Sequence, residues 1–198
     1  MRVITGSARG RSLKELEGLE TRPTTSRVKE GLFSALQFDI EGRQVLDLFA
    51  GTGQLGIECL SRGASGAVFV DQRKDAAAVI RENLRRTGLQ DRGQVVQGDA
   101  LAFLERAGQG FDLVFLDPPY ASGLRELALE RLTRPGFDIL NPYGIIVTEH
   151  PADQTPPALP PSYRLQRTYR YGKIAVTLFR RNGGEINEAA EVPPPAGR

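Results

Sequence analysis

The sequence predicts a doubly wound α/β fold in one main domain. From residue 44 onward, short apolar runs alternate with segments of helical periodicity, which is the pattern of a parallel sheet with helices on both faces. A glycine-rich stretch follows the first apolar run, at the point where such folds bind ligands. The length of 198 residues is enough for one such domain and too short for two of ordinary size.

The first 38 residues are predicted to form a basic extension outside the sheet. Residues 3–13 have the composition of a small hairpin, and Arg27–Leu36 has helical periodicity with Ser and Thr residues before it as N-caps. Lys29 and Glu30 of this helix are expected to form a surface pair of little energetic value. Four arginines are candidates for contact with the phosphates of a nucleic acid: Arg9, Arg11, Arg22 and Arg27.

The central part is predicted to alternate five strands with four helices. The strands are expected near residues 44–48, 67–71, 94–97, 111–116 and 144–149. The helices are expected at Leu55–Arg62, Lys74–Arg86, Ala100–Arg106 and Leu124–Arg134. Because helices separate the strands, the connections favour a mostly parallel sheet.

The last part of the chain has a different pattern. Only Gly172 and Lys173 separate Tyr163–Tyr171 from Ile174–Arg180, so these two runs predict a hairpin. Prolines at 156, 157, 160 and 161 make the preceding segment a loop with little freedom to be helical. The main domain is expected over residues 39–182, and the aperiodic stretch 183–198 is expected to be a disordered tail.

Basic residues are concentrated in two segments that flank an acidic centre. Residues 1–29 contain seven Lys or Arg against three Asp or Glu, and residues 163–181 contain six against none. Residues 30–162 contain twelve against eighteen. Such clustering is typical of proteins that bind a phosphate backbone, although a solvated surface also produces it.

Composition argues against several classes of protein. No apolar run approaches the ~20 residues of a membrane span, and the N-terminus lacks the features of a secretory signal, so a cytoplasmic location without membrane attachment is expected. Cys59 is the only cysteine and His150 the only histidine. An internal disulfide and a Cys/His zinc cluster are therefore excluded, and no metal site is predicted.

A glycine-rich turn after the first strand is the predicted cofactor site. The glycines at 51, 53 and 56 match the spacing of a dinucleotide-binding loop, and Phe49 and Ala50 lead into it. Asp71 ends the next strand, at the position of the acidic residue that holds a ribose. Taken alone, this pattern permits an NAD-dependent oxidoreductase.

Asp47 favours a different cofactor. A carboxylate just ahead of the glycine loop repels a pyrophosphate but can pair with the ammonium group of a methionine moiety, which favours S-adenosylmethionine. Asp71 then accepts the ribose hydroxyls, and Asp99 and Ala100 offer a carboxylate and an amide to the adenine edge. Asp71 and Asp99 both stand at strand-to-helix junctions, so helix N-capping is the alternative role for each.

The sequence Asp117-Pro118-Pro119-Tyr120 follows the fourth strand and is the predicted catalytic site. An exocyclic amine on a base is a poor nucleophile because its lone pair is delocalised into the ring. If the Asp117 carboxylate and the Pro118 carbonyl each accept an N–H, the lone pair is directed at the sulfonium methyl. Pro119 helps to fix the backbone, Tyr120 can stack on the base, and a helical base must first be flipped out.

At this point the residues resemble a known family. The loop from Asp47 to Gly56 together with Asp-Pro-Pro-Tyr resembles class I methyltransferases that act on amino nitrogens. Three further segments resemble the bacterial RsmD family, the 16S ribosomal RNA guanine-N2 methyltransferases, over roughly residues 1–181. These segments are residues 2–11 with Arg-Val-Ile-Thr-Gly and Arg-Gly-Arg, residues 22–33 beginning Arg-Pro-Thr-Thr, and Tyr171-Gly172-Lys173.

The resemblance implies a Rossmann-like sheet of seven strands with the last strand antiparallel. It also implies an N-terminal extension that helps to hold RNA, and one target guanine, numbered 966 in 16S ribosomal RNA, within an assembled or assembling small subunit. Because Asp-Pro-Pro-Tyr also occurs in adenine-N6 enzymes, the choice of guanine depends on the family. A DNA adenine-N6 or protein glutamine methyltransferase, and an RNA-binding module with a degenerate methyltransferase fold, are the alternatives.

Overall fold

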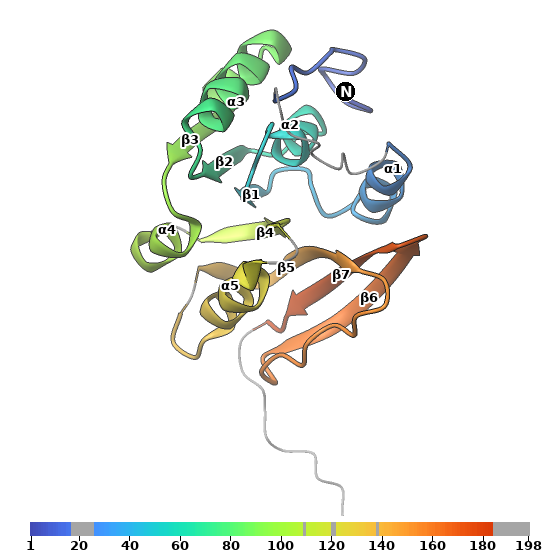
Figure 1. Ribbon diagram of the computed structural model, residues 1–198, viewed down its shortest axis with the longest axis vertical. Coiled ribbons are helices and arrows are strands. Elements are labelled where there is room, and N and C mark those ends of the chain that lie inside the picture. The colour runs from blue at the N-terminus through green and yellow to red at the C-terminus, as the bar shows by residue number, and fades with distance from the viewer. Residues whose placement is uncertain (17–25, 109, 120–121, 138, 184–198) are drawn as a thin grey trace, which may run out of the picture.

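The protein is built around a mixed sheet of seven strands in the order β3-β2-β1-β4-β5-β7-β6 (Figure 1). The computed structural model describes residues 1–16, 26–108, 110–119, 122–137 and 139–183. The first five strands of this order pair in parallel, and β7 runs antiparallel to β5 and β6. The strands are β1 (Gln44–Leu48), β2 (Gly66–Asp71), β3 (Gly93–Gln97), β4 (Phe111–Leu116), β5 (Leu140–Pro151), β6 (Tyr163–Tyr171) and β7 (Ile174–Arg181).

Helices cover both faces of the sheet. The strands alternate their apolar side chains between two cores: one packs against α1, α2 and α3, and the other packs against α4 and α5 (Figure 1). None of the helices in the described ranges is long and apolar enough to span a membrane. The helices are α1 (Ser26–Ala35), α2 (Gln54–Ser61), α3 (Lys74–Thr87), α4 (Ala100–Arg106) and α5 (Leu124–Thr133), with a short 3-10 helix η1 (Gln90–Arg92) before β3.

The N-terminal segment lies outside the sheet but is anchored to the core. Its hairpin consists of one isolated bridge between Arg2 and Ser12, and its apolar side chains join the core under α1, α2 and α3. The carboxylate of Glu58 in α2 is 1% exposed and accepts the backbone N–H groups of Ile4 and Thr5 at 2.8 and 3.0 Å. The segment is therefore fixed to α2 through a buried side chain.

Lys29 shows that the expected surface ion pair in α1 is wrong. Its side chain is buried, and its ammonium donates to the backbone carbonyl of Arg2 at 3.0 Å. Burial lowers the pKa of Lys29, and the charge of nearby Glu58 acts against this shift. Lys29 stands three and four residues before Leu32 and Phe33, on the core side of α1, and the N-terminal segment, distant in sequence, supplies the acceptor for its ammonium.

β5 is longer than the predicted strand at 144–149. Leu140 already pairs with Phe111, and an irregularity separates this pair from the regular ladder that begins at Ile145. Tyr143 lies within this irregularity and has a φ of 62°, a backbone conformation that residues other than glycine rarely adopt. The sequence Asn141-Pro142-Tyr143-Gly144 has the composition of a loop, so the sequence pattern did not indicate that the strand begins at Leu140.

We expect Glu58→Ala to lower the free energy of unfolding by about 3 kcal/mol in urea titrations, because it empties a buried site and leaves two partly buried N–H groups without an acceptor. It also removes the partner of Arg62, whose Nε donates to Glu58 at 2.9 Å. Glu82→Ala is the matched control, because its pairs with Arg85 and Arg86 lie in solvent, and it should have little effect. Equal losses in the two variants would contradict the anchoring role.

Candidate active site

Four carboxylates lie along one edge of the sheet, where the parallel strands end. Phe69, Phe115 and Val147 point into the α1–α3 core, and two residues further along the same strands the same face carries Asp71, Asp117 and Glu149. Asp47 stands in register with Phe69 and Phe115, one step below the edge. In strand order these acidic residues are Asp71, Asp47, Asp117 and Glu149, and we call them the acidic row.

The glycine loop brings the backbone close to the sheet. Phe49 has a φ of 73°, and both its N–H and that of Ala50 donate to the carbonyl of Val70 at 3.0 and 2.9 Å. Gly51 and Gly53 also have positive φ angles. A Cβ at position 56 would stand 2.4 Å from the ring of Phe69, so only glycine allows α2 to pack this close to β2.

Hydrogen bonds tie the first two carboxylates of the acidic row to this loop. Asp47 accepts the N–H of Gly56 at 3.0 Å, and Asp71 accepts the N–H of Gly51 at 2.8 Å and that of Arg73 at 2.9 Å. The N-cap position of α3 belongs to Arg73. Asp71 thus braces the loop instead of capping a helix through its side chain.

Asp99 does cap a helix, as its alternative role predicted. Its carboxylate accepts the N–H of Ala102 at 2.7 Å at the start of α4, and the side chain is otherwise exposed. Ala100 is the first residue of α4 and is buried. The second carboxylate oxygen of Asp99 leaves room for a further role, which the capping geometry neither requires nor prevents.

Gln54 is a residue of the loop that the sequence reasoning missed. Its side-chain oxygen is buried, and among the described residues it has no hydrogen-bond partner. A buried acceptor without a donor costs free energy, so its position beside the glycine loop fits a ligand that brings a donor. No sequence motif identified it, because glutamine at the start of a helix is ordinary.

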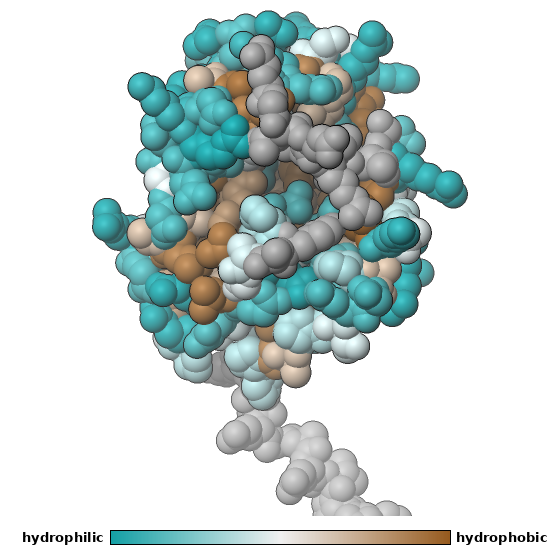
Figure 2. Space-filling model, in the orientation of Figure 1, coloured by the Kyte–Doolittle hydropathy of each residue, from teal (hydrophilic) through white to brown (hydrophobic). Residues whose placement is uncertain are grey.

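The fourth strand ends as predicted in a half-buried Asp117, followed by a buried Pro118 and an exposed Pro119. Tyr120 lies outside the described residues. Asp117 and Glu149 line one small pocket with Leu32 of α1 and Leu55 of α2. In the orientation of Figure 1, the visible face of the molecule is hollowed near its centre (Figure 2).

Glu149 was also missed as a site residue by the sequence reasoning. The signal for it is the register, since Leu116 of β4 pairs with Thr148 of β5, and the residues that follow these two are Asp117 and Glu149. Register between strands far apart in the chain cannot be read from one sequence. His150, its neighbour, is buried, and its two ring nitrogens contact the Pro151 carbonyl and the Thr177 hydroxyl at 2.9 and 2.8 Å.

Burial and neighbouring charges raise the pKa values of two carboxylates of the acidic row. Burial raises the pKa of Asp47 to about 7, the N–H of Gly56 acts against this shift, and the charge of Asp71 adds to it. Burial also raises the pKa of Asp117 well above its usual range, and the charges of Glu149 and Asp47 raise it further. The row is therefore a site with a strong preference for a cation or for N–H donors.

Two of the predicted RNA-binding arginines, Arg9 and Arg11, belong to a segment that is held at the C-terminal ends of α2 and α3, away from the acidic row. Arg9, Arg11 and Arg27 are exposed, and Arg22 lies outside the described residues. The guanidinium of Arg11 donates to the backbone carbonyl of Arg86 near the C-terminal end of α3 at 2.9 Å. In the described ranges, no group of three His, Cys, Asp or Glu side chains is arranged to hold a metal ion.

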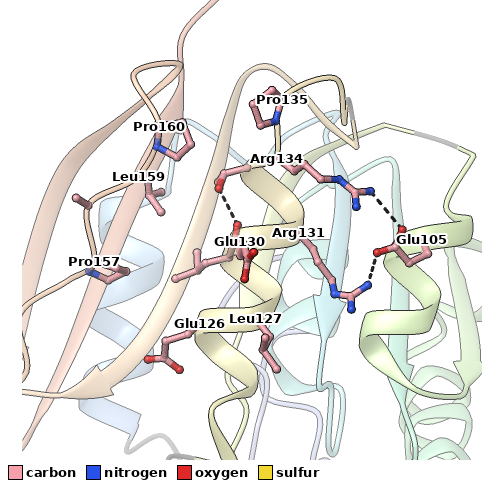
Figure 3. A pocket seen from close by; sticks show the side chains of 13 residues that line it. Glu105, Glu126, Leu127, Glu130, Arg131, Arg134, Pro135, Pro157, Leu159 and Pro160 are labelled. Atoms are coloured by element: carbon pink, nitrogen blue, oxygen red, sulfur yellow. Dashed lines mark hydrogen bonds and ion pairs between the residues drawn. The ribbon is translucent and has the colours of Figure 1, made fainter.

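A larger cavity of about 770 Å³ lies on the other side of the sheet (Figure 3). It is lined by α5, by Glu105 of α4 and by the loop from Pro157 to Pro160, so it contains none of the predicted site residues. Arg131 and Arg134 both pair with Glu105 across it. These two arginines are thus neutralised within the protein, and the acidic row is the candidate for the catalytic site.

The strand order, the antiparallel β7 and the glycine loop after β1 define the fold of a class I methyltransferase. Among solved structures, "Putative methyltransferase yhhF from Escherichia coli" matches with a TM-score of 0.82 and 36% identity, covering 93% of this chain and 99% of that one. A more distant structure shares the fold alone, with a TM-score of 0.61 and 17% identity over 77% of this chain and 49% of that one. It is described as "Crystal structure of SMU.776, a putative methyltransferase complexed with SAH".

The chain belongs to the RsmD family. The family model described as "Conserved hypothetical protein 95" matches residues 1–180. The relative named "Ribosomal RNA small subunit methyltransferase D", from Escherichia coli strain K12, is 35% identical over 189 residues, which cover 96% of this chain and 94% of the relative. The predicted family and the predicted class I fold are confirmed.

The raised pKa of Asp47 predicts a pH dependence of stability. Between its unfolded value of about 4 and its folded value of about 7, the folded protein keeps a proton that the unfolded chain has released. The free energy of unfolding should therefore fall as the pH rises from 4 to 7. Asp47→Asn should reduce this slope and raise the free energy of unfolding at pH 8 by roughly 2 to 4 kcal/mol.

The measurement is urea unfolding of the ligand-free protein at several pH values. Asp99→Asn is the control, since this carboxylate is exposed and asparagine also caps helices. Its pH profile should match that of the unmodified protein. If the free energy of unfolding had the same slope against pH in the unmodified protein and in Asp47→Asn, the pKa of Asp47 would not be raised in the folded state.

Proposed function

We propose that this protein transfers a methyl group from S-adenosylmethionine to the exocyclic N2 of a guanine in 16S ribosomal RNA, the guanine at position 966. The observation that supports the proposal is the acidic row, which brings Asp71 and Asp47 beside Asp117 and Glu149 at one sheet edge. The family and the names of its relatives support ribosomal RNA as the substrate. The distant structural neighbour, which is described as complexed with SAH, supports the cofactor.

The residues around the glycine loop fit this cofactor. S-adenosylmethionine supplies an electrophilic methyl group on a sulfonium and carries a second positive charge on its ammonium. Asp47 and the buried oxygen of Gln54 would hold the ammonium end, and Asp71 would hold the ribose. Phe49, Ala50, Gly51 and Gly53 would form the floor of the site, and Asp99 with Ala100 would meet the adenine.

Asp117 and Pro118 would direct the nucleophile. Each would accept an N–H of the target amine, so that the nitrogen lone pair faces the cofactor, and Asp117 would stabilise the charge that develops on nitrogen and take up its proton. Pro119 would keep this segment rigid, and Tyr120 would stack on the base. A nearby cation lowers the pKa of a carboxylate, so a bound cofactor would favour the ionised form of Asp117.

Glu149 supports guanine over adenine as the acceptor. With the cofactor bound and Asp117 ionised, the two neighbouring carboxylates would only accept hydrogen bonds. Guanine presents two neighbouring donors, the N1–H and the N2 amine, whereas adenine presents one donor and one acceptor. Asp117 would take the N2 amine and Glu149 the N1–H, and the ring nitrogen of adenine would be repelled.

RNA contact by the N-terminal extension is part of the same proposal. Arg9, Arg11 and Arg27 are exposed and would meet phosphates, as would Arg22. Their contacts would position the RNA without reading its sequence. The division into an extension over residues 1–38, a catalytic domain over 39–182 and a tail over 183–198 belongs to this proposal, and residues 184–198 lie outside the described ranges.

We expect Asp117→Ala to reduce methyl transfer at least 100-fold and to leave cofactor affinity, measured by calorimetry, within about threefold. Mass mapping of small-subunit RNA from cells lacking the gene should show one unmethylated guanine, which the unmodified protein restores and the variant does not. Asp153→Ala, in the exposed loop after β5, is the control and should restore it. A comparable loss of cofactor affinity would move Asp117 into the cofactor site.

The guanine proposal can be tested by replacing the target base with 2,6-diaminopurine, which keeps the N2 amine but has an acceptor at N1. The unmodified protein should methylate the analogue at least 100-fold less efficiently in kcat/KM. Glu149→Gln, whose amide can donate to N1, should narrow this ratio at least tenfold, and Glu105→Gln on exposed α4 should not change it. Equal rates on both bases would refute the role of Glu149.

A further inference from the structure

The edge strand β6 carries a set of basic side chains that the proposed catalytic function does not use. Residues 163–181 contain six Lys or Arg and no acidic residue. Arg164, Arg167 and Arg170 on β6 and Lys173 in the following turn are exposed. We call these four the β6 cations. From Arg164 to Arg170 they extend over about 20 Å of strand.

These cations have no carboxylate partners in the described part of the chain. Several other surface arginines do have one: Arg85 and Arg86 pair with Glu82, and Arg131 and Arg134 pair with Glu105. The interaction found for the β6 arginines is that of Arg167, which lies 5.3 Å from the ring of Tyr169. Unpaired cations on one strand repel one another. Their concentration on β6 therefore favours a polyanionic partner.

Protection of a sheet edge does not account for this composition. Charged side chains on an edge strand prevent pairing with other chains, and β6 pairs only with β7 among the described strands. Acidic residues or a mixture of signs would serve that purpose equally well. All the charges of this segment are positive.

The β6 cations lead to the acidic row. β6 runs in the direction of β5, so its carboxyl end lies at the edge where Glu149 lies, two strand spacings or about 10 Å away. The carbonyl of Lys173 accepts the N–H of Ala152 at 3.0 Å, which fastens the β6–β7 turn to the end of β5. Arg164 and Arg167 stand in register with Arg180 and Leu178, on the sheet face that carries Glu149, whereas Arg170 stands in register with Ala175 and His150 on the opposite face.

The N-terminal arginines are placed less favourably. Residues 5–8 contact Ser61 at the end of α2, and Arg11 contacts the end of α3, so this segment lies beside the amino ends of the strands (Figure 1). The catalytic crevice is at the opposite ends. Arg9 and Arg11 therefore lie at the end of the sheet remote from the crevice, whereas the β6–β7 turn lies at the same end as Glu149.

We propose that the β6 cations form the main RNA-docking surface, on which the phosphates next to the target base bind. This inference rests on the proposed function. The surface would hold the RNA backbone while the target base reaches Asp117 and Glu149. Because such contacts are made with phosphates, they would supply affinity and position without sequence selection.

The test compares two triple variants in binding to protein-free small-subunit RNA over a range of salt concentrations. Arg164→Gln with Arg167→Gln and Arg170→Gln should weaken binding at least tenfold at low salt and reduce the slope of log affinity against log salt by about two units. The matched control changes Arg81, Arg85 and Arg86 of α3 to Gln. α3 packs over β2 and β3, and β2 is five strand spacings or about 24 Å from β6, so the control should keep the slope.

Each outcome decides the inference. A changed slope in the α3 variant with an unchanged slope in the β6 variant would assign RNA to the N-terminal side and overturn it. A β6 variant that binds free RNA normally but loses affinity for the intact small subunit would indicate a protein partner and also overturn it. Calorimetry with the cofactor reports folding, and the single variants Arg167→Gln and Arg170→Gln should each lower the slope by about 0.7 if the triple variant fails to fold.

Failure of the proposed function gives a different result. If the unmodified protein binds RNA with a steep salt slope that the β6 variant loses, and neither transfers a methyl group, the docking surface stands and the catalytic proposal is wrong. If the unmodified protein methylates RNA and the β6 variant has the same slope and rate, only the docking surface is wrong.

Discussion

The parallel register of β2, β1, β4 and β5 is the constraint on which the site depends. Parallel strands end at one edge, and residues at matching positions then lie side by side whatever their distance in the chain. Here the matching positions on β2, β4 and β5 are acidic, and Asp47 of β1 lies two residues further back on the same face. Burial first, and then the charges of neighbouring carboxylates, raise the pKa values of Asp47 and Asp117, so these groups are costly to ionise.

Because of this electrostatic cost, the carboxylates that favour ligand binding lower the stability of the ligand-free protein. A ligand that brings positive charge or N–H donors to this edge relieves the repulsion between the carboxylates. This relief adds to the free energy of binding. The same arrangement disfavours a pyrophosphate, even though the glycine loop satisfies the spacing of a dinucleotide-binding loop. The selectivity of the site thus originates in side chains beneath the loop and not in the glycines themselves.

Most of the fold could be predicted because its signals are local. The strand and helix positions from residue 44 to 134 follow from periodicity, and the hairpin of β6 and β7 follows from its two-residue turn. Lys29, the beginning of β5 and Glu149 could not be predicted in the same way. Lys29 is covered by a segment distant in sequence, β5 begins beyond a left-handed tyrosine, and the importance of Glu149 comes from its register with Asp117.

The position of β4 in the middle of the sheet has a consequence for how the chain folds. β1, β2 and β3 with their helices are complete by Gln97, and at that stage one side of β1 has no neighbour, because its partner on that side begins only at Phe111. The exposed side belongs to an apolar strand buried on both faces in the native state. During synthesis at the ribosome, the nascent chain therefore passes through an interval in which one edge of this central strand is unprotected, and the emergence of β4 ends it.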